Sequence, residues 1–93
     1  MDRLLAQNSS GPRYLQRPDI AQMVVEAIQY RDPAEYLLHS FVVMPNHVQM
    51  LITPRVPAAG IMQSLKRFTA RQANRILGLT GRPFWQDESY DRL

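Results

Sequence analysis

The chain has 93 residues, of which 45% are hydrophobic, so it is expected to form a single domain with one modest core. It has no cysteine, no apolar run near the roughly 18 residues of a membrane span and no secretory signal, so disulfide frameworks and thiolate metal sites are excluded and a cytoplasmic protein is expected. The formal charge is +3, and residues 56–85 carry five basic side chains and no acidic one. Such a segment is typical of a polyanionic partner, and a solvated helix face is an equally good interpretation of the charge alone.

Helical and extended patterns follow one another along the first half of the chain. Residues 8–12 are rich in turn-forming types and predict a loop. A proline at the first helical position and apolar residues at helical spacing predict a helix from Pro18 to about Tyr30. Aromatic and β-branched residues then predict strands at 36–44 and 47–53, joined by a tight Pro45-Asn46 turn.

The longest predicted helix runs from Ala58 to about Leu77. Its buried stripe is expected to contain Ile61, Leu65, Phe68, Gln72 or Ala73, and Ile76. Its arginines recur every fourth residue and so form a row along another face: Arg67, Arg71 and Arg75. A further strand is expected to begin near residues 84–86, which predicts an α+β domain with two helices on one face of an antiparallel sheet.

Two polar side chains stand out on the strand at 47–53. Strand alternation places His47 and Gln49 side by side on one face, opposite Val48 and Met50. An imidazole nitrogen and an amide oxygen in this arrangement could hold one divalent ion that polarises a phosphate oxygen. A hydrogen-bonded structural histidine is the alternative, and His39 on the preceding strand is interpreted in that way.

Three stretches of the chain occur in a fixed order: Phe41–Ile52 (FVVMPNHVQMLI), Ile61–Arg71 (IMQSLKRFTAR) and Phe84–Asp91 (FWQDESYD). Together they resemble the single-tyrosine HUH transposases, and more narrowly those associated with repetitive extragenic palindromes. The resemblance covers residues 11–93. It implies a ferredoxin-like sandwich, a bound Mg²⁺ or Mn²⁺ ion, single-stranded or hairpin DNA as the partner, and a tyrosine that attacks a DNA phosphate and stays attached to the 5′ end.

The resemblance assigns the metal-ligand roles, and the charge pattern of the chain adds further candidates. His47 would be the first metal ligand, and Gln49 stands where the family has a second histidine. The amide oxygen of Gln49 suits Mg²⁺ better than it suits softer metals. Asp87 or Glu88 could add a third oxygen, with an acidic surface loop as the alternative. The residues expected to contact DNA phosphates, next to the His-Gln pair, are Lys66, Arg67, Arg71 and Arg75.

The sequence departs from the family at both ends. The family's nucleophile lies in a helical motif resembling Tyr-Ile-x-x-Asn-Pro, which residues 1–93 do not contain, so no catalytic residue is expected and Tyr90 is only a weak substitute. We therefore expect an incomplete domain spanning 1–93, without that C-terminal helix. We also expect the family's first strand to be missing, which would expose an apolar sheet edge and invite a homodimer.

Three hypotheses about function follow from these observations. The first is a transposase-family domain that binds DNA but is catalytically defective. The second is a non-catalytic DNA-binding or regulatory module, and the third is a decayed gene remnant or an interaction protein that pairs through an open sheet edge.

Overall fold

The computed structural model describes the backbone of residues 3–79 and 81–92 and the side chains of residues 3–79 and 81–86. A short 3-10 helix at Tyr14–Gln16 precedes the first long helix. The main elements are β1 (Leu4–Ser9), α1 (Pro18–Tyr30), β2 (Tyr36–Met44), β3 (His47–Pro54), α2 (Ala58–Leu77) and β4 (Asp87–Arg92). The expected bounds of both helices and of β2 are confirmed.

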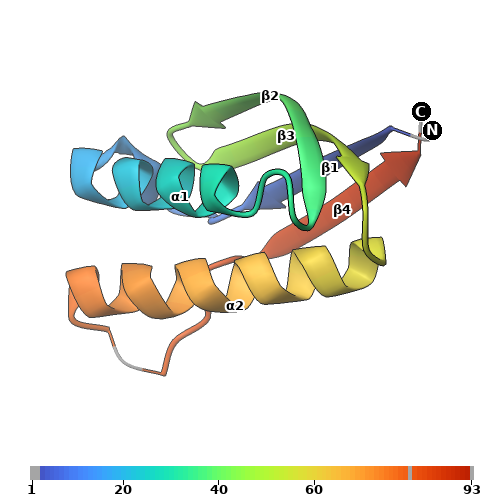
Figure 1. Cartoon of the computed structure of the whole chain (residues 1–93). Helices are drawn as coiled ribbons and strands as arrows, with labels where there is room; N and C mark the ends of the chain where they lie inside the picture. Colours follow the sequence, from blue (N-terminus) through green and yellow to red (C-terminus); the bar gives the residue numbers. More distant parts are fainter. Residues whose placement is uncertain (1–2, 80, 93) are drawn as a thin grey trace.

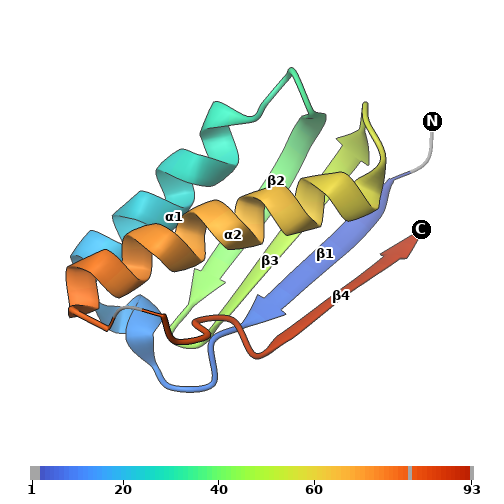
Figure 2. The same ribbon diagram turned by 90° about the horizontal axis from the view of Figure 1, so that it is seen from below.

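The strands form one antiparallel sheet in the order β2-β3-β1-β4. Both helices cover the same face of this sheet, and within residues 3–79 and 81–92 no helix lies on the other face (Figures 1 and 2). The order of elements and strands is that of a ferredoxin-like sandwich, as predicted. Among the described residues, neither helix combines the length and the apolarity needed to cross a bilayer.

The prediction that the first strand is missing is wrong. β1 lies in the middle of the sheet, where Leu4 pairs with Ile52 of β3 and Ser9 pairs with His47. Its residues alternate between buried and partly exposed, so the loop expected at 8–12 begins only after Ser9. β1 contains no β-branched or aromatic residue, and its extended form depends on pairing with both neighbours rather than on local propensity.

The buried stripe of α2 differs from the predicted one. It consists of Ala58, Ile61, Met62, Leu65, Thr69 and Ala73. Phe68, predicted to lie in the core, is 40% exposed, and Thr69 takes the inward position. The Thr69 hydroxyl donates to the Leu65 carbonyl at 2.7 Å and accepts from Trp85 Nε1 at 2.9 Å, so a polar residue is satisfied in the core.

A β-bulge interrupts β2 at His39. The register shifts between Leu38 and Ser40, and His39 at the bulge is exposed. Its Nε2 atom lies 2.6 Å from the Thr53 hydroxyl of β3. This contact supports the interpretation of His39 as a hydrogen-bonded structural residue.

Tyr36 connects β2 to the end of α1. Its ring is fully buried, burial raises the pKa of its hydroxyl, and this neutral hydroxyl donates to the Ile28 carbonyl at 2.5 Å. Ile28 carries one of the last four carbonyls of α1, which lack helical partners. Replacement Tyr36→Phe is therefore expected to cost about 1–3 kcal/mol of unfolding free energy, measured by urea denaturation. An unchanged midpoint would show that this hydrogen bond contributes nothing.

Candidate functional site

The face of the sheet without helices carries a small polar cluster. In β3, Val48 and Met50 are buried beneath the helices, and His47 and Gln49 lie on the opposite face, as the alternation predicted. The register places Ser9 opposite His47 and Gln7 opposite Gln49. We call His47, Gln49, Gln7 and Ser9 the open-face cluster. Gln7 and Ser9 were missed from the sequence because β1 was not expected.

Hydrogen bonds orient three members of the open-face cluster, Gln7, Gln49 and Ser9. Gln49 Nε2 donates to Gln7 Oε1 at 3.2 Å, which holds the Gln49 amide against the neighbouring strand. The Ser9 hydroxyl donates to the Asn46 carbonyl at 3.2 Å, at the turn that precedes His47. The cluster is thus built on paired strands, which position side chains more firmly than loops do.

The donors of the open-face cluster fit a divalent ion in part. One imidazole and one amide oxygen lie on the same strand two residues apart, and Mg²⁺ or Mn²⁺ accepts such ligands. No group of three His, Cys, Asp or Glu side chains suited to a metal occurs in the described part of the chain. The candidates Asp87, Glu88 and Tyr90 lie in β4, whose side chains are outside the described residues. Among the described side chains, His47 and Gln49 are thus the candidate ligands, and solvent or phosphate oxygens could complete the shell of a bound ion.

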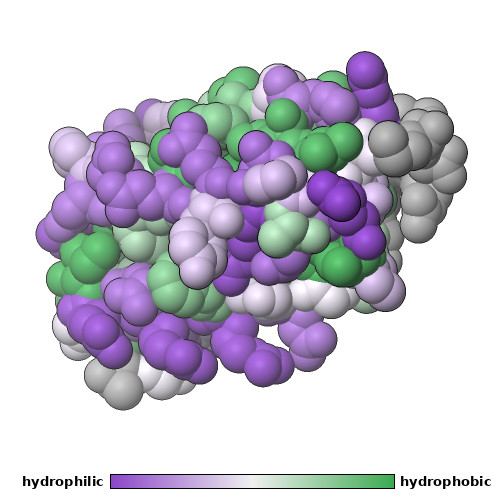
Figure 3. Space-filling model, viewed as in Figure 1, coloured by the Kyte–Doolittle hydropathy of each residue, from purple (hydrophilic) through white to green (hydrophobic). Residues whose placement is uncertain are grey.

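The predicted basic row lies on the outer surface of α2. Arg67, Arg71 and Arg75 are exposed, and Lys66 beside them is partly buried. Hydrophilic side chains cover most of the lower margin of the molecule in Figure 3, where α2 runs in Figure 1. The row therefore presents guanidinium groups to solvent, where they can make paired hydrogen bonds to phosphates.

The sequence predicted that the basic row lies next to His47 and Gln49, and this prediction is wrong. α2 packs on the sheet face that carries Val48 and Met50, so the alternate residues of β3 point away from it. In Figure 2, α2 crosses in front of the sheet, so the sheet separates this helix from the residues of β3 that face the other side. A DNA strand that contacts both the basic row and the His47–Gln49 pair would have to pass around an edge of the sheet.

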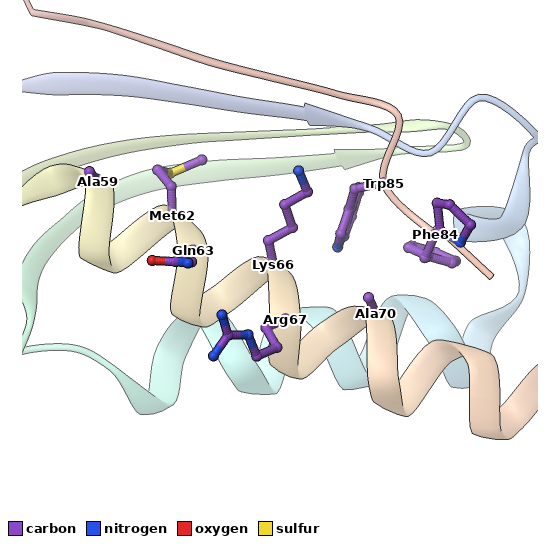
Figure 4. Close-up of a pocket in the computed structure, with 9 residues that line it drawn as sticks. Ala59, Met62, Gln63, Lys66, Arg67, Ala70, Phe84 and Trp85 are labelled. Carbon is purple, nitrogen blue, oxygen red and sulfur yellow. The ribbon is translucent and has the colours of Figure 1, made fainter. Parts of the chain in front are cut away.

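A hollow of about 630 Å³ lies beside the basic row. Met62, Phe84 and Trp85 form an apolar wall, and Lys66 and Arg67 supply positive charge. Figure 4 shows Lys66 extending from α2 between Met62 and Trp85. Such a hollow could hold a phosphate near its cations and a flat apolar group against its wall.

The wall of this hollow is fixed by the segment that leads into β4. Phe84 and Trp85 are buried and meet edge to face, with ring centroids 4.8 Å apart. Gln86 donates its backbone N–H to the Ser9 carbonyl at 2.7 Å, at the end of β1. The segment therefore links the helix layer to the centre of the sheet.

Two of the solved structures with this fold are described as a candidate transposase and a transposase. One is a candidate transposase from Deinococcus radiodurans, with a TM-score of 0.71 and 19% identity over the whole of this chain and 77% of that protein. The other is a REP-associated tyrosine transposase bound to a REP hairpin, with a TM-score of 0.61 and 16% identity over 99% of this chain. The present chain spans 55% of that hairpin-bound protein.

The likeness extends to a protein of another kind. A candidate antibiotic biosynthesis monooxygenase from Deinococcus radiodurans matches all of this chain and 90% of its own, with a TM-score of 0.51 and 15% identity. No protein-family model matches the sequence, and no curated protein matches it significantly. At these identities the comparisons show the fold, and function has to be argued from the residues themselves.

Proposed function

We propose that the chain is a cytoplasmic, transposase-family domain that binds single-stranded or hairpin DNA through Lys66, Arg67, Arg71 and Arg75. The observation that carries the proposal is the exposed arginine row on α2, within a segment, 56–85, that has no acidic residue. The shared fold with a transposase bound to a REP hairpin supports the same partner. Arginine is suited to this role because its planar group bonds phosphate oxygens in pairs.

The open-face cluster would have a separate task in this proposal. His47 and the Gln49 amide oxygen would hold Mg²⁺ or Mn²⁺, which when bound polarises a phosphate oxygen. Gln7 would keep the Gln49 amide in place through its 3.2 Å hydrogen bond. Residues 1–93 contain no Tyr-Ile-x-x-Asn-Pro motif, so we propose binding without strand cleavage by this polypeptide.

The test is a binding measurement with three fluorescent oligonucleotides: a single strand, a single strand next to a hairpin, and a blunt duplex. The first two are expected to bind more tightly than the duplex, with affinity that falls as salt rises. Preference for the duplex, or no binding at low salt, would contradict the proposal. A decayed remnant is excluded if the same protein melts cooperatively as a monomer.

The same oligonucleotides incubated with Mn²⁺ or Mg²⁺ are expected to give no covalent adduct on a denaturing gel. A phosphotyrosine-linked product would show that the domain is catalytic and would point to Tyr90 or another tyrosine. The second candidate function is a non-catalytic DNA-binding regulator, for which the exposed arginine row is sufficient. It predicts that the domain competes with an intact transposase for its hairpin.

Restoring the family's second histidine is expected to strengthen metal binding. Gln49→His should raise the affinity for Mn²⁺ about 10-fold, because an imidazole nitrogen is a stronger donor to a transition-metal ion than a neutral amide oxygen is. His47→Ala should abolish binding in either background. Free Mn²⁺ measured by electron paramagnetic resonance gives the affinity. Gln63→His, which adds a histidine to the exposed surface of α2, is the control, and an equal gain there would contradict a site at His47.

A further inference from the structure

We propose that the groove between α1 and α2 holds an unpaired nucleobase of the bound strand, stacked against Phe68. This inference rests on the proposed function and deepens it, since it assigns a contact to the bases as well as to the phosphates. It concerns a part of the surface that the sequence assigned to the core.

Phe68 has the environment of a stacking platform. Its side chain is 40% exposed, and the Arg31 guanidinium carbon lies over its ring, 5.5 Å from the centroid. The Arg31 side chain is only 10% exposed. It donates to the Ala27 carbonyl at 3.2 Å and to the Ser64 hydroxyl at 3.4 Å. The Arg31 guanidinium is therefore held against the ring of Phe68, and part of this ring remains exposed to solvent. This arrangement favours stacking of a base on the ring.

The groove next to Phe68 has the size and lining for a base. It encloses about 540 Å³, and Met23, Ala27 and Tyr30 contribute to its walls. Tyr30 is 85% exposed and offers a second aromatic surface at the same groove. The Gln72 amide also lines it and can hydrogen-bond to the edge of a base.

The charges of the groove favour a base over a phosphate. Glu26 and Arg31, which have opposite charges, both line it, so the groove has no excess of positive charge, and Glu26 would repel a phosphate. Arg67 and Arg71 lie one residue before and three residues after Phe68 and are exposed along the same helix. A strand with its phosphates on the arginine row could therefore place a base in the groove. The same cationic row argues against a protein as the occupant, unless that protein is strongly acidic.

The experiment compares an oligo-dT strand with an abasic strand of the same length, which has the same number of phosphates and no bases. The wild-type protein is expected to bind oligo-dT about 5- to 100-fold more tightly, as stacking of one or two bases on aromatic side chains typically provides. Phe68→Leu should remove most of this preference and leave the affinity for the abasic strand unchanged. Phe68→Tyr, which keeps the ring, should retain the preference.

The outcomes distinguish a failure of the groove inference from a failure of the proposed DNA-binding function. If Phe68→Leu leaves the oligo-dT preference intact, the groove inference is overturned and the arginine row still stands as the DNA contact. If the wild-type protein binds neither strand, the proposed function itself fails. Should Phe68→Leu not fold, Tyr30→Ala alters an exposed side chain of the same groove and must reduce the preference. If Phe68→Leu instead converts a dimer to a monomer at unchanged DNA affinity, the groove is a protein interface and the inference is wrong.

Discussion

Replacing Arg67, Arg71 and Arg75 together by alanine is expected to lower the affinity for single-stranded DNA by at least about 100-fold at low salt. Hydrogen bonds to charged groups contribute roughly 1.5–3 kcal/mol each, and solvent reduces this value at exposed positions such as these. Each lost phosphate contact should also reduce the slope of log affinity against log salt by about 0.7, so the slope should become shallower by about 2 units. Fluorescence anisotropy over a range of salt concentrations measures both effects.

The control removes the same charge from elsewhere on the molecule. Arg3, Arg13 and Arg55 are exposed and lie outside α2, so their triple alanine variant has the same net charge as the test variant. This control should lose much less affinity and keep most of its salt slope. An equal loss in both variants would show that net charge, and no particular surface, attracts the DNA.

The elements that were correctly predicted are those with strong local signals. Pro18 fixes the start of α1, where Asp19 accepts hydrogen bonds from the Arg17 side chain at 2.8 and 3.1 Å. Gly78 ends α2 with a φ of 69°, a left-handed conformation that glycine adopts without strain. The two-residue link at Pro45-Asn46 sets the β2–β3 register, in which Met44 faces His47.

The elements that were missed depend on distant partners. β1 has the weak local pattern LLAQNS, and its extended form becomes clear only when β3 and β4 lie on either side of it. Hydropathy favours Phe68 over Thr69 for the core. Trp85, 16 residues further along the chain, reverses that order by donating to the Thr69 hydroxyl. No pattern within one helix contains this information.

The same distinction applies to the candidate site. The common face of His47 and Gln49 follows from strand alternation alone and was predicted. The position of α2 on the opposite face could not be predicted from α2, because its basic row indicates only which side meets solvent. Gln7, the hydrogen-bonding partner of Gln49, lies 42 residues away in the sequence and is brought to it by the central position of β1.

Trp85→Ala is expected to have the largest effect on stability of any substitution in the segment before β4. Trp85 is 5% exposed, contacts Phe84 edge to face and donates to Thr69. It lines a small internal space together with Ala6 of β1 and Thr69 of α2, so its removal leaves a cavity between these elements. Truncation of a buried tryptophan typically costs about 3–5 kcal/mol. Since 1 kcal/mol shifts the melting temperature of a domain of this size by roughly 4–8 °C, a decrease of more than about 12 °C is expected.

Trp85→Phe separates the two contributions of this side chain. It keeps an aromatic ring and removes only the indole N–H, while the Thr69 hydroxyl still donates to the Leu65 carbonyl at 2.7 Å. It should therefore cost clearly less than Trp85→Ala, about 1–2 kcal/mol in the absence of a large cavity. Thermal melts followed by circular dichroism test both variants. Near-equal melting temperatures for wild type and Trp85→Ala would mean that Trp85 does not join α2 to the sheet, and the wall of the hollow beside the basic row would then lose its physical basis.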